Sequence, residues 1–360
     1  YLHHLQNVEQ QWHNLWWNIM ALQTSGPISL NDMHVEVGGT SGTLCSVNDA
    51  DIRDLISRNA NTQQSFLEYY GKSAETSLPT SGSTINGQVQ LKQITASSYI
   101  SSGGTLRVPS NMWVWSDSRT VAALIIDIPC TVVNDGKIIG KGGRGAYRLP
   151  TSGGNFNAET GGPAISVTST GVTITNSSGA YIAGGGGGGG ARYDGGDPTD
   201  SNAGGGGGAG GGQGGNARND AFLGGSGGQL NAVGGNGSSI YNSSYSFAIG
   251  GGAGGAGGGF GSGGGGGGRI LPGVGGKNGG VYATGSTLAG GFEICEGGSA
   301  GNVGHGPNPV GGYYSDMAAG GGGWGARGGH GSVLNGGAGG AAITGTARTL
   351  SNSGTIYGST

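Results

Sequence analysis

The first 24 residues alternate apolar and polar positions with the spacing of a coiled coil. The apolar positions, separated by alternating steps of four and three, are Tyr1, Leu5, Val8, Trp12, Leu15, Ile19 and Leu22. Such a heptad seam is buried against a partner helix. The bulk of Trp12 at a core position favours three strands over two. Residues 1–24 therefore predict the end of a trimeric stalk with an oligomer seam of Leu5, Val8, Trp12, Leu15, Ile19 and Leu22. A single amphipathic helix packed on its own domain is the alternative.

Residues 25–80 have the mixed pattern of a small connector domain. The run Thr24-Ser25-Gly26-Pro27 ends the first helix. Asn48-Asp49-Ala50-Asp51 is a helix-capping phrase, and the apolar Ile52, Leu55 and Ile56 follow at helical spacing. We expect one short helix here.

Residues 81–182 change to the period-two, β-branched pattern of short strands. One turn phrase, an Asn followed shortly by Gly between apolar residues, occurs at 132–140, 174–184 and 350–358. Glycine after Asn supplies the positive φ of a tight turn. The three copies bracket the glycine-rich half of the chain. They predict either β-coils that cap the first and last helices of that half or unrelated hairpins.

Glycine dominates the remainder of the chain. Of the 91 glycines, 20 precede residue 183 and 71 follow. A flexible linker is disfavoured by the spaced aromatic and aliphatic residues, and collagen by the lack of a proline-rich Gly-X-Y repeat. Bundled polyglycine-II helices fit best, because they have three residues per turn and direct every backbone group at a neighbour. From Gly204 the triplets GGG GGA GGG QGG keep glycine in every middle position.

The predicted fold is thus an N-terminal coiled-coil helix, a connector, a β-rich middle (81–182), a polyglycine-II sandwich with apical loops (183–345) and a C-terminal capping strand (346–360), with little α-helix overall. Ordering glycine costs about 0.5–1 kcal/mol more than ordering alanine. A net hydrogen bond returns only about 0.5–1.5 kcal/mol. Nearly all backbone groups of the glycine-rich part must therefore be paired, which requires a rigid slab.

Short segments without long glycine runs interrupt this half, and we expect them to be turns at the two ends of the slab. Loops on a rigid scaffold carry binding residues, and Tyr with Ser, Asn and Gly is typical of recognition surfaces. The alternative is that some tyrosines only cover the slab's edge. The predicted receptor-binding residues are Arg192, Tyr193, Asp194, Asp197, Tyr241, Asn242, Tyr245, Phe247, His305, Asn308, Tyr313, Tyr314 and Asp316.

Composition narrows the chemistry further. With 16 basic and 19 acidic residues, the chain has no basic surface for nucleic acid. No apolar run approaches the length of a membrane span. Nothing predicts a cofactor or a metal site, because His305 and His330 lie far apart without partner ligands. The carboxylate pair Glu293 and Glu296 has no apolar pocket to raise one pKa, so catalytic residues are not predicted.

Two resemblances suggest a function. The phrases ISLNDMHVEVGGTSGT, NDADIRDLI and SFLEYYGKS resemble a connector module of phage tail and tail-fibre proteins. The glycine runs at 184–190, 204–215, 250–268 and 320–323 resemble the glycine-rich adhesins at the long-tail-fibre tips of T-even-type phages. The N-terminal half departs from them and looks more like the C-terminal tip of a trimeric, lambdoid-type tail fibre.

These resemblances imply a non-enzymatic virion protein, assembled in the host cytoplasm and acting outside the cell. It would bind a bacterial outer-membrane protein such as a porin or transporter, or lipopolysaccharide, as a homotrimer or on a trimeric fibre. Two alternatives stay open: a tailspike that binds or cleaves polysaccharide, and a structural or ice-binding polyglycine protein.

Overall fold

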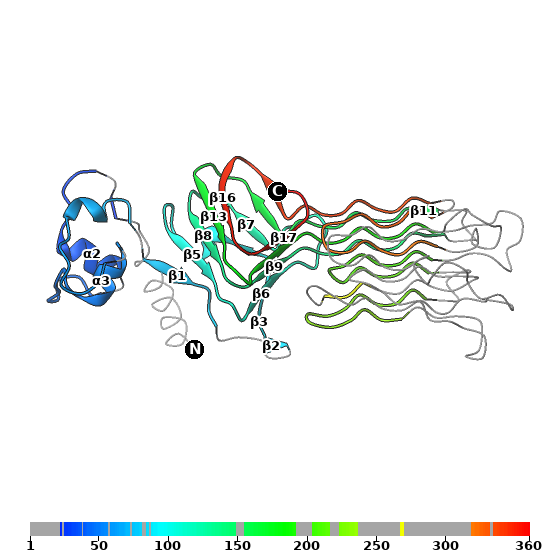
Figure 1. The fold of residues 1–360 in the computed structure, drawn as a ribbon, viewed down its shortest axis with the longest axis horizontal. Coiled ribbons are helices and arrows are strands. Elements are labelled where there is room, and N and C mark those ends of the chain that lie inside the picture. Colours follow the sequence, from blue (N-terminus) through cyan, green and yellow to red (C-terminus); the bar gives the residue numbers. More distant parts are fainter. Residues whose placement is uncertain are drawn as a thin grey trace, which may run out of the picture.

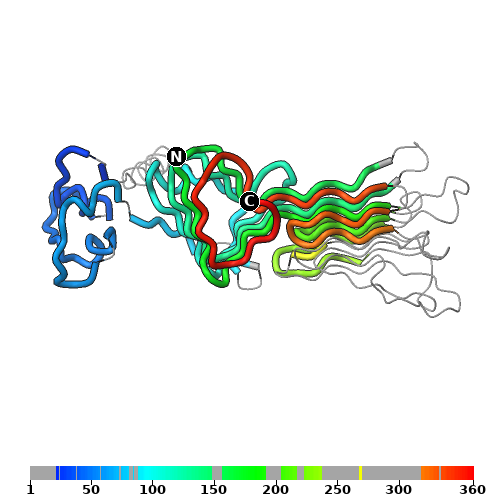
Figure 2. Tube along the Cα trace, turned by 45° about the horizontal axis from the view of Figure 1, so that its top comes forward, coloured from blue at the N-terminus to red at the C-terminus, as the bar shows by residue number. Residues whose placement is uncertain are grey.

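The computed structural model has three parts along its long axis (Figure 1). It describes residues 22–23, 25–37, 39–56, 58–72, 74–80, 84–85, 88–148, 155–191, 204–216, 223–236, 267–269, 318–331 and 334–360. A helical unit (residues 22–72) lies at one end. A stack of parallel β-coils, here called the β-prism (residues 75–139, 164–183 and 343–360), lies in the middle. A bundle of extended glycine-rich segments forms the other end (Figure 2). Within the described residues no helix is long and apolar enough to cross a membrane.

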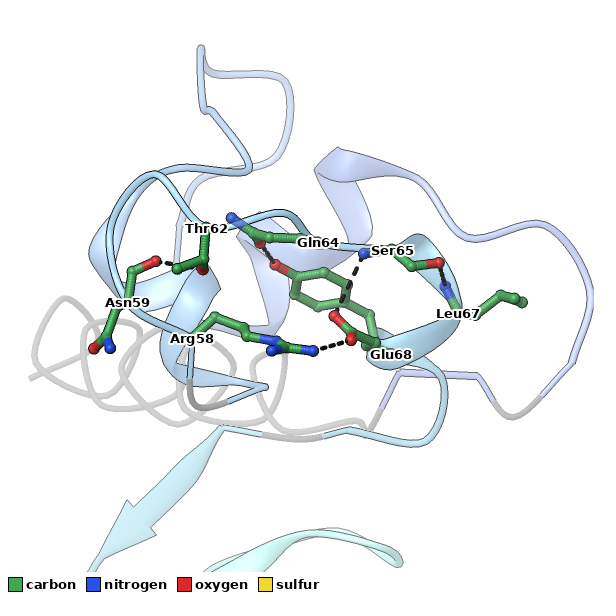
Figure 3. A network of polar contacts seen from close by, with 8 residues as sticks. Arg58, Asn59, Thr62, Gln64, Ser65, Leu67 and Glu68 are labelled. Carbon is green, nitrogen blue, oxygen red and sulfur yellow. Dashed lines mark hydrogen bonds and ion pairs between the residues drawn. The ribbon is translucent and has the colours of Figure 1, made fainter.

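The helical unit is held by local capping. It contains α2 (Leu30–Glu36), α3 (Ala50–Asp54) and the 3-10 helix η1 (Phe66–Tyr69). Ser65 and Glu68 form a capping box at η1, and Glu68 also pairs with Arg58 (Figure 3). Such reciprocal caps satisfy backbone N–H groups that have no partner inside a helix. The predicted short helix after Asn48 is present as α3.

A small core of its own stabilises this unit. Leu22, Met33, Ile52 and Tyr69 are buried against one another. Leu22, expected at the oligomer seam, is only 5% exposed, and its N–H donates to the carbonyl oxygen of Lys72 at 2.7 Å. It contributes to a core within the chain, while the other five predicted seam residues lie outside the described residues.

Three sheets make up the β-prism. Successive strands of the chain go to successive sheets, so that coils stack in parallel. The first sheet contains β1 (Glu75–Ser77), β5 (Thr105–Val108), β8 (Thr131–Asn134), β13 (Val172–Asn176) and β16 (Arg348–Asn352). The second contains β2 (Thr84–Ile85), β3 (Gln88–Lys92), β6 (Met112–Trp115), β9 (Lys137–Ile139), β14 (Tyr181–Ala183) and β17 (Thr355–Tyr357). The third contains β4 (Ile94–Thr95), β7 (Leu124–Ile126), β12 (Ile165–Val167) and β15 (Ile343–Gly345), and the 3-10 helix η2 (Ala96–Ser98) follows β4.

Aliphatic rows fill the interior of the β-prism. Every neighbouring pair in the three sheets is parallel except β2 with β3, so equivalent side chains of successive coils lie directly above one another. The rows are Ile94–Leu124–Ile165–Ile343, Leu106–Val132–Ile174–Leu350 and Val114–Ile138–Ile182–Ile356. They form one hydrophobic core. The predicted β-rich, helix-poor fold is confirmed.

The three repeated turn phrases form equivalent corners of this stack. They join β8 to β9, β13 to β14 and β16 to β17, with Asn134, Asn176 and Asn352 in register. The interpretation as β-coils is therefore correct and the one as unrelated hairpins is wrong, while the capping role of the coils stays a prediction.

Glycine-rich segments are insertions into the β-prism. The chain leaves after β9 at Gly140 and returns to β12. It leaves again after β14 at Gly184 and returns to β15 at Ile343. Residues 346–360 were expected to form a separate capping strand. They instead belong to the last coil of the β-prism, because β16 and β17 pair in register with β13 and β14.

Along segment 185–190 of the bundle, the direction of the backbone hydrogen bonds repeats every three residues. Along 185–190, successive amides donate to carbonyls of three different segments, at 2.7–2.9 Å: to Gly162 and Glu159, to Ala209 and Gly206, and to Ala326 and Gly329. The carbonyls of the same residues accept from three further segments, around 143–146, 319–322 and 337–340. Segment 185–190 therefore has six hydrogen-bonded neighbours and is fully paired.

Close backbone approach explains the glycine content. A Cβ on Gly188 would lie 1.9 Å from the carbonyl oxygen of Arg144, and one on Gly185 would lie 2.0 Å from that of Lys141. On the outer segment 334–340, burial itself repeats every third residue, and Asn335 and Ala338 are exposed. Along 335–340, the exposed side chains thus lie on the outward face of the segment.

The turns nearest the β-prism differ from the prediction. We expected run 204–215 to be one segment, but it reverses at Ala209–Gly211, where Gly210 and Gly211 have φ of 95° and 76°. Other reversals lie at Leu230–Asn231 and Trp324–Gly325. Positive φ is accessible to glycine at low cost. A glycine run can therefore turn without any change in composition.

Candidate functional site

The bundle has a distal end, which lies away from the β-prism. Ala146, Gly189 and Gly205 share one hydrogen-bonded level there: the Ala146 amide donates to Gly189 and the Gly205 amide to Ala146. Ala146 and Ala191 pack with Leu334 as a small apolar plug. This distal end lies opposite the helical unit (Figure 1).

A short hairpin of aromatic residues lies at this level. β10 (Tyr147–Arg148) pairs antiparallel with β11 (Asn155–Phe156). The Tyr147 and Phe156 rings stack with centroids 4.5 Å apart and planes 3° apart, and the Arg144 guanidinium lies 4.0 Å from the Tyr147 centroid. Phe156 is 41% exposed. This feature was missed from the sequence, although Tyr147 and Phe156 flank a Pro150-Thr151-Ser152-Gly153-Gly154 turn phrase that signals a hairpin.

All thirteen predicted receptor-binding residues lie outside the described residues, within 192–203, 237–266 and 270–317. The structure brings together the described segments that flank the first of these stretches. The carbonyl of Ala191 accepts from Leu334, and the amide of Gly205 donates to Ala146, so both segments reach the distal end.

A Trp-lined junction supports the proximal turns of the bundle. Trp113 and Trp324 are fully buried and pack with Ala209 and Leu230. The guanidinium of Arg269 lies 4.7 Å from the Trp115 centroid and donates to the carbonyl of Gly210 at 3.0 Å. Burial lowers the pKa of Arg269 to about 10. This junction fixes the turns onto the β-prism and is part of the scaffold.

A polar cavity lies on the flank, where the bundle meets the β-prism. Its volume is about 450 Å³. Loop 117–120, Lys141, Arg144, Glu159 and Gln213 line it, together with Gly142. No aromatic or aliphatic side chain contributes, so the cavity suits a hydrophilic ligand. Over the described part of the chain, no group of three metal-ligating side chains occurs.

One family model and one solved structure are similar to this chain. The family model "Phage tail fibre adhesin Gp38" matches residues 75–262, more than half of the chain, starting at the first residue of β1. None of the curated proteins compared matches. One solved structure, the gp37-gp38 adhesin tip complex of the bacteriophage S16 long tail fibre, is similar at 19% identity and a TM-score of 0.45, covering 93% of this chain and 99% of that one. On the family match, the chain belongs to the Gp38 phage tail fibre adhesins, non-enzymatic receptor-binding proteins of the phage virion.

Proposed function

We propose that this chain is the tip of a tail fibre and binds a protein of the bacterial outer membrane, such as a porin or a transporter, to start infection. The proposal rests on the backbone hydrogen bonds of 185–190, whose amides donate in turn to three neighbouring segments. A fully paired lattice is stiff, and a stiff support is what a recognition surface needs if binding is not to cost additional ordering.

The glycine segments are, in this proposal, polyglycine-II helices. Three residues per turn and outward-directed backbone groups define that helix. The three-residue rotation, and the 1.9 Å approach of a Cβ on Gly188 to a neighbouring carbonyl, both support it.

Receptor contacts are assigned to the stretches around 192–200, 239–247 and 305–316. Their Tyr, Asn, Asp and His side chains offer large contact areas and adaptable hydrogen bonds. The distal position of the described residues Ala191 and Gly205 supports this assignment for the first stretch. The stacked Tyr147 and Phe156 would add an aromatic contact at the same level.

Attachment to the fibre is assigned to the opposite end. Leu44, Phe66 and Leu67 of the helical unit are 102%, 45% and 78% exposed. Exposed apolar side chains of this kind would be covered by a protein partner if they form part of an interface. Residues 1–24 would then complete the connection, either as a homotrimer through their heptad seam or as one subunit on a trimeric fibre.

Competition for adsorption tests the proposal. Purified protein should block adsorption of its phage to host cells, and resistant hosts should carry mutations in one outer-membrane protein gene. Cells lacking that protein should bind no purified chain. If resistance maps only to polysaccharide synthesis and purified protein binds cells lacking every major porin, the protein-receptor assignment is wrong.

A further inference from the structure

The flank cavity between the bundle and the β-prism has an excess of positive charge. Two salt bridges neutralise charges of the lining. Arg119 makes a bidentate salt bridge with Glu159 at 2.9 Å, and Asp117 pairs with Lys92 at 3.1 Å. Lys141 and Arg144 then remain as lining cations without a salt-bridge partner among the described residues. The whole chain, in contrast, has a net charge of −3.

A backbone carbonyl of the bundle holds the Lys141 side chain at the cavity. Its Nζ donates to the carbonyl oxygen of Gly211 at 2.6 Å, which leaves two N–H groups of the ammonium for other acceptors. Burial, followed by repulsion from Arg269, lowers the pKa of Lys141 to about 8. An anion bound here would relieve the cost of burying this charge.

Arg144 is the second donor. Its guanidinium is positioned by the Tyr147 ring, and its Nε is buried without a hydrogen-bond partner among the described residues. A buried donor left unpaired costs about 1–3 kcal/mol, so an acceptor from a ligand would be favoured.

The rest of the lining suits a polyol. The Ser118 and Thr120 hydroxyls, the Gln213 amide and the Asp117 carboxylate line the cavity together with the two cations. A volume of about 450 Å³ lies in the range of small-ligand sites and holds more than an isolated inorganic ion.

We propose that this flank cavity is a second binding site, specific for a sugar that bears one phosphate or carboxylate group. Lys141 and Arg144 bind the anionic group, and Gln213 with the hydroxyls of loop 117–120 binds the ring. The site extends along the flank from loop 117–120 of the β-prism to Arg144, three residues before Tyr147. An adhesin docked by its distal end would therefore reach acidic surface glycans with its flank.

Calorimetric titration with small sugars tests this site on the full chain, independently of the proposed distal receptor contacts. Glucose 1-phosphate and glucuronic acid distinguish a phosphate from a carboxylate source, with glucose as the neutral reference. We expect saturable binding of one of the two acidic sugars and at least about ten-fold weaker binding of glucose, since charge-assisted hydrogen bonds are the strong ones. Binding should also weaken as the pH rises through 8. Of the charged groups that face Lys141, Arg269 and Arg119 oppose its protonation, and Asp117 and Glu159 favour it.

Variants locate the site. Arg144→Gln and Lys141→Gln should each weaken binding of the acidic sugar on the order of ten-fold. Arg327→Gln removes the same charge from an exposed position of the bundle outside the cavity, and should leave binding unchanged. If the Lys141→Gln protein does not fold, the affinity of the Arg144→Gln protein for the acidic sugar tests the site alone. Equal binding of glucose, binding of inorganic phosphate with no acidic sugar bound, unchanged affinity in Arg144→Gln, or an equal loss in Arg327→Gln would overturn the proposal.

Discussion

The side-chain amide of Asn176 donates a hydrogen bond of 2.8 Å to the side-chain oxygen of Asn352, although 176 positions separate the two residues. Asn134 donates in the same way to Asn176, also at 2.8 Å. The ladder joins three coils across both glycine-rich insertions. The last coil therefore pairs with coils that precede the long insertion in the sequence, and both ends of that insertion are anchored in one core.

Removing the middle of this ladder should destabilise the β-prism. Asn176 is fully buried and also donates to the carbonyl of Thr355. We expect Asn176→Ala to lower the free energy of unfolding by about 2–3 kcal/mol, because buried partners lose their hydrogen bonds. Asn352→Ala, at the exposed end of the ladder, should cost less than about 1 kcal/mol. Urea unfolding measures both, and equal losses would contradict the ladder's role.

A methyl group inside the lattice should not be accommodated. In Gly188→Ala, the new Cβ would meet the Arg144 carbonyl oxygen at 1.9 Å, so neighbouring segments must separate. We expect a loss of at least about 3 kcal/mol, at the upper end of overpacking costs. Ala338→Ser adds an atom on the exposed face and should change the melting temperature little. A Gly188→Ala protein that melts like the wild type would refute close lattice packing at this position.

The helical unit should respond to pH through Glu36. This residue is 5% exposed, accepts from the Ala74 amide at 2.8 Å, and burial raises its pKa to about 7. An acid whose pKa is raised on folding destabilises the fold when ionised, so stability should fall as pH rises from about 4.5 to 7. Glu36→Gln should be more stable than the wild type by about 1–3 kcal/mol at pH 8 and similar to it below pH about 4.5. Chemical denaturation at the two pH values checks this, and a pH-independent difference would contradict it.

The aromatic hairpin at the distal end should contribute to adsorption without supporting the fold. Phe156→Ala removes the ring that stacks on Tyr147, and we expect cell binding to weaken several-fold, by about 1–2 kcal/mol of contact energy. Val233→Ala, an exposed apolar residue near the proximal turn at Leu230–Asn231, is the matched control. Adsorption measured with purified protein should fall only for Phe156→Ala, and equal adsorption by both variants would remove Tyr147 and Phe156 from the contact surface.

The sequence predicted features that depend on local chemistry. Asn134, Asn176 and Asn352 could be recognised because each begins the same turn, and the period-two pattern around Ile174 reflects a buried strand face. The reversal at Gly210 and Gly211 could not be predicted, because glycine forms a helix and a turn equally well and leaves no change in composition.

The other features that the sequence did not predict depend on contacts between residues far apart in the chain. The repeated turn phrase marks residues 350–358 as equivalent to 174–184, but the register that pairs Arg348 with Val172 depends on where a long insertion returns. Leu22 matched a heptad seam and also a small intrachain core, because both require an apolar residue at helical spacing. The flank cavity combines residues 117–120, 141–144, 159 and 213, which are dispersed in the sequence.

Replacement of the three predicted recognition stretches tests whether they bind the receptor. Residues 192–200, 239–247 and 305–316 are exchanged for Gly/Ser segments of equal length, and binding of purified protein to host cells is measured beside thermal unfolding. We expect an unchanged melting temperature for the β-prism and bundle, with cell binding reduced at least about a hundred-fold, since a few anchor residues dominate such interfaces. Full cell binding by this folded variant would contradict it.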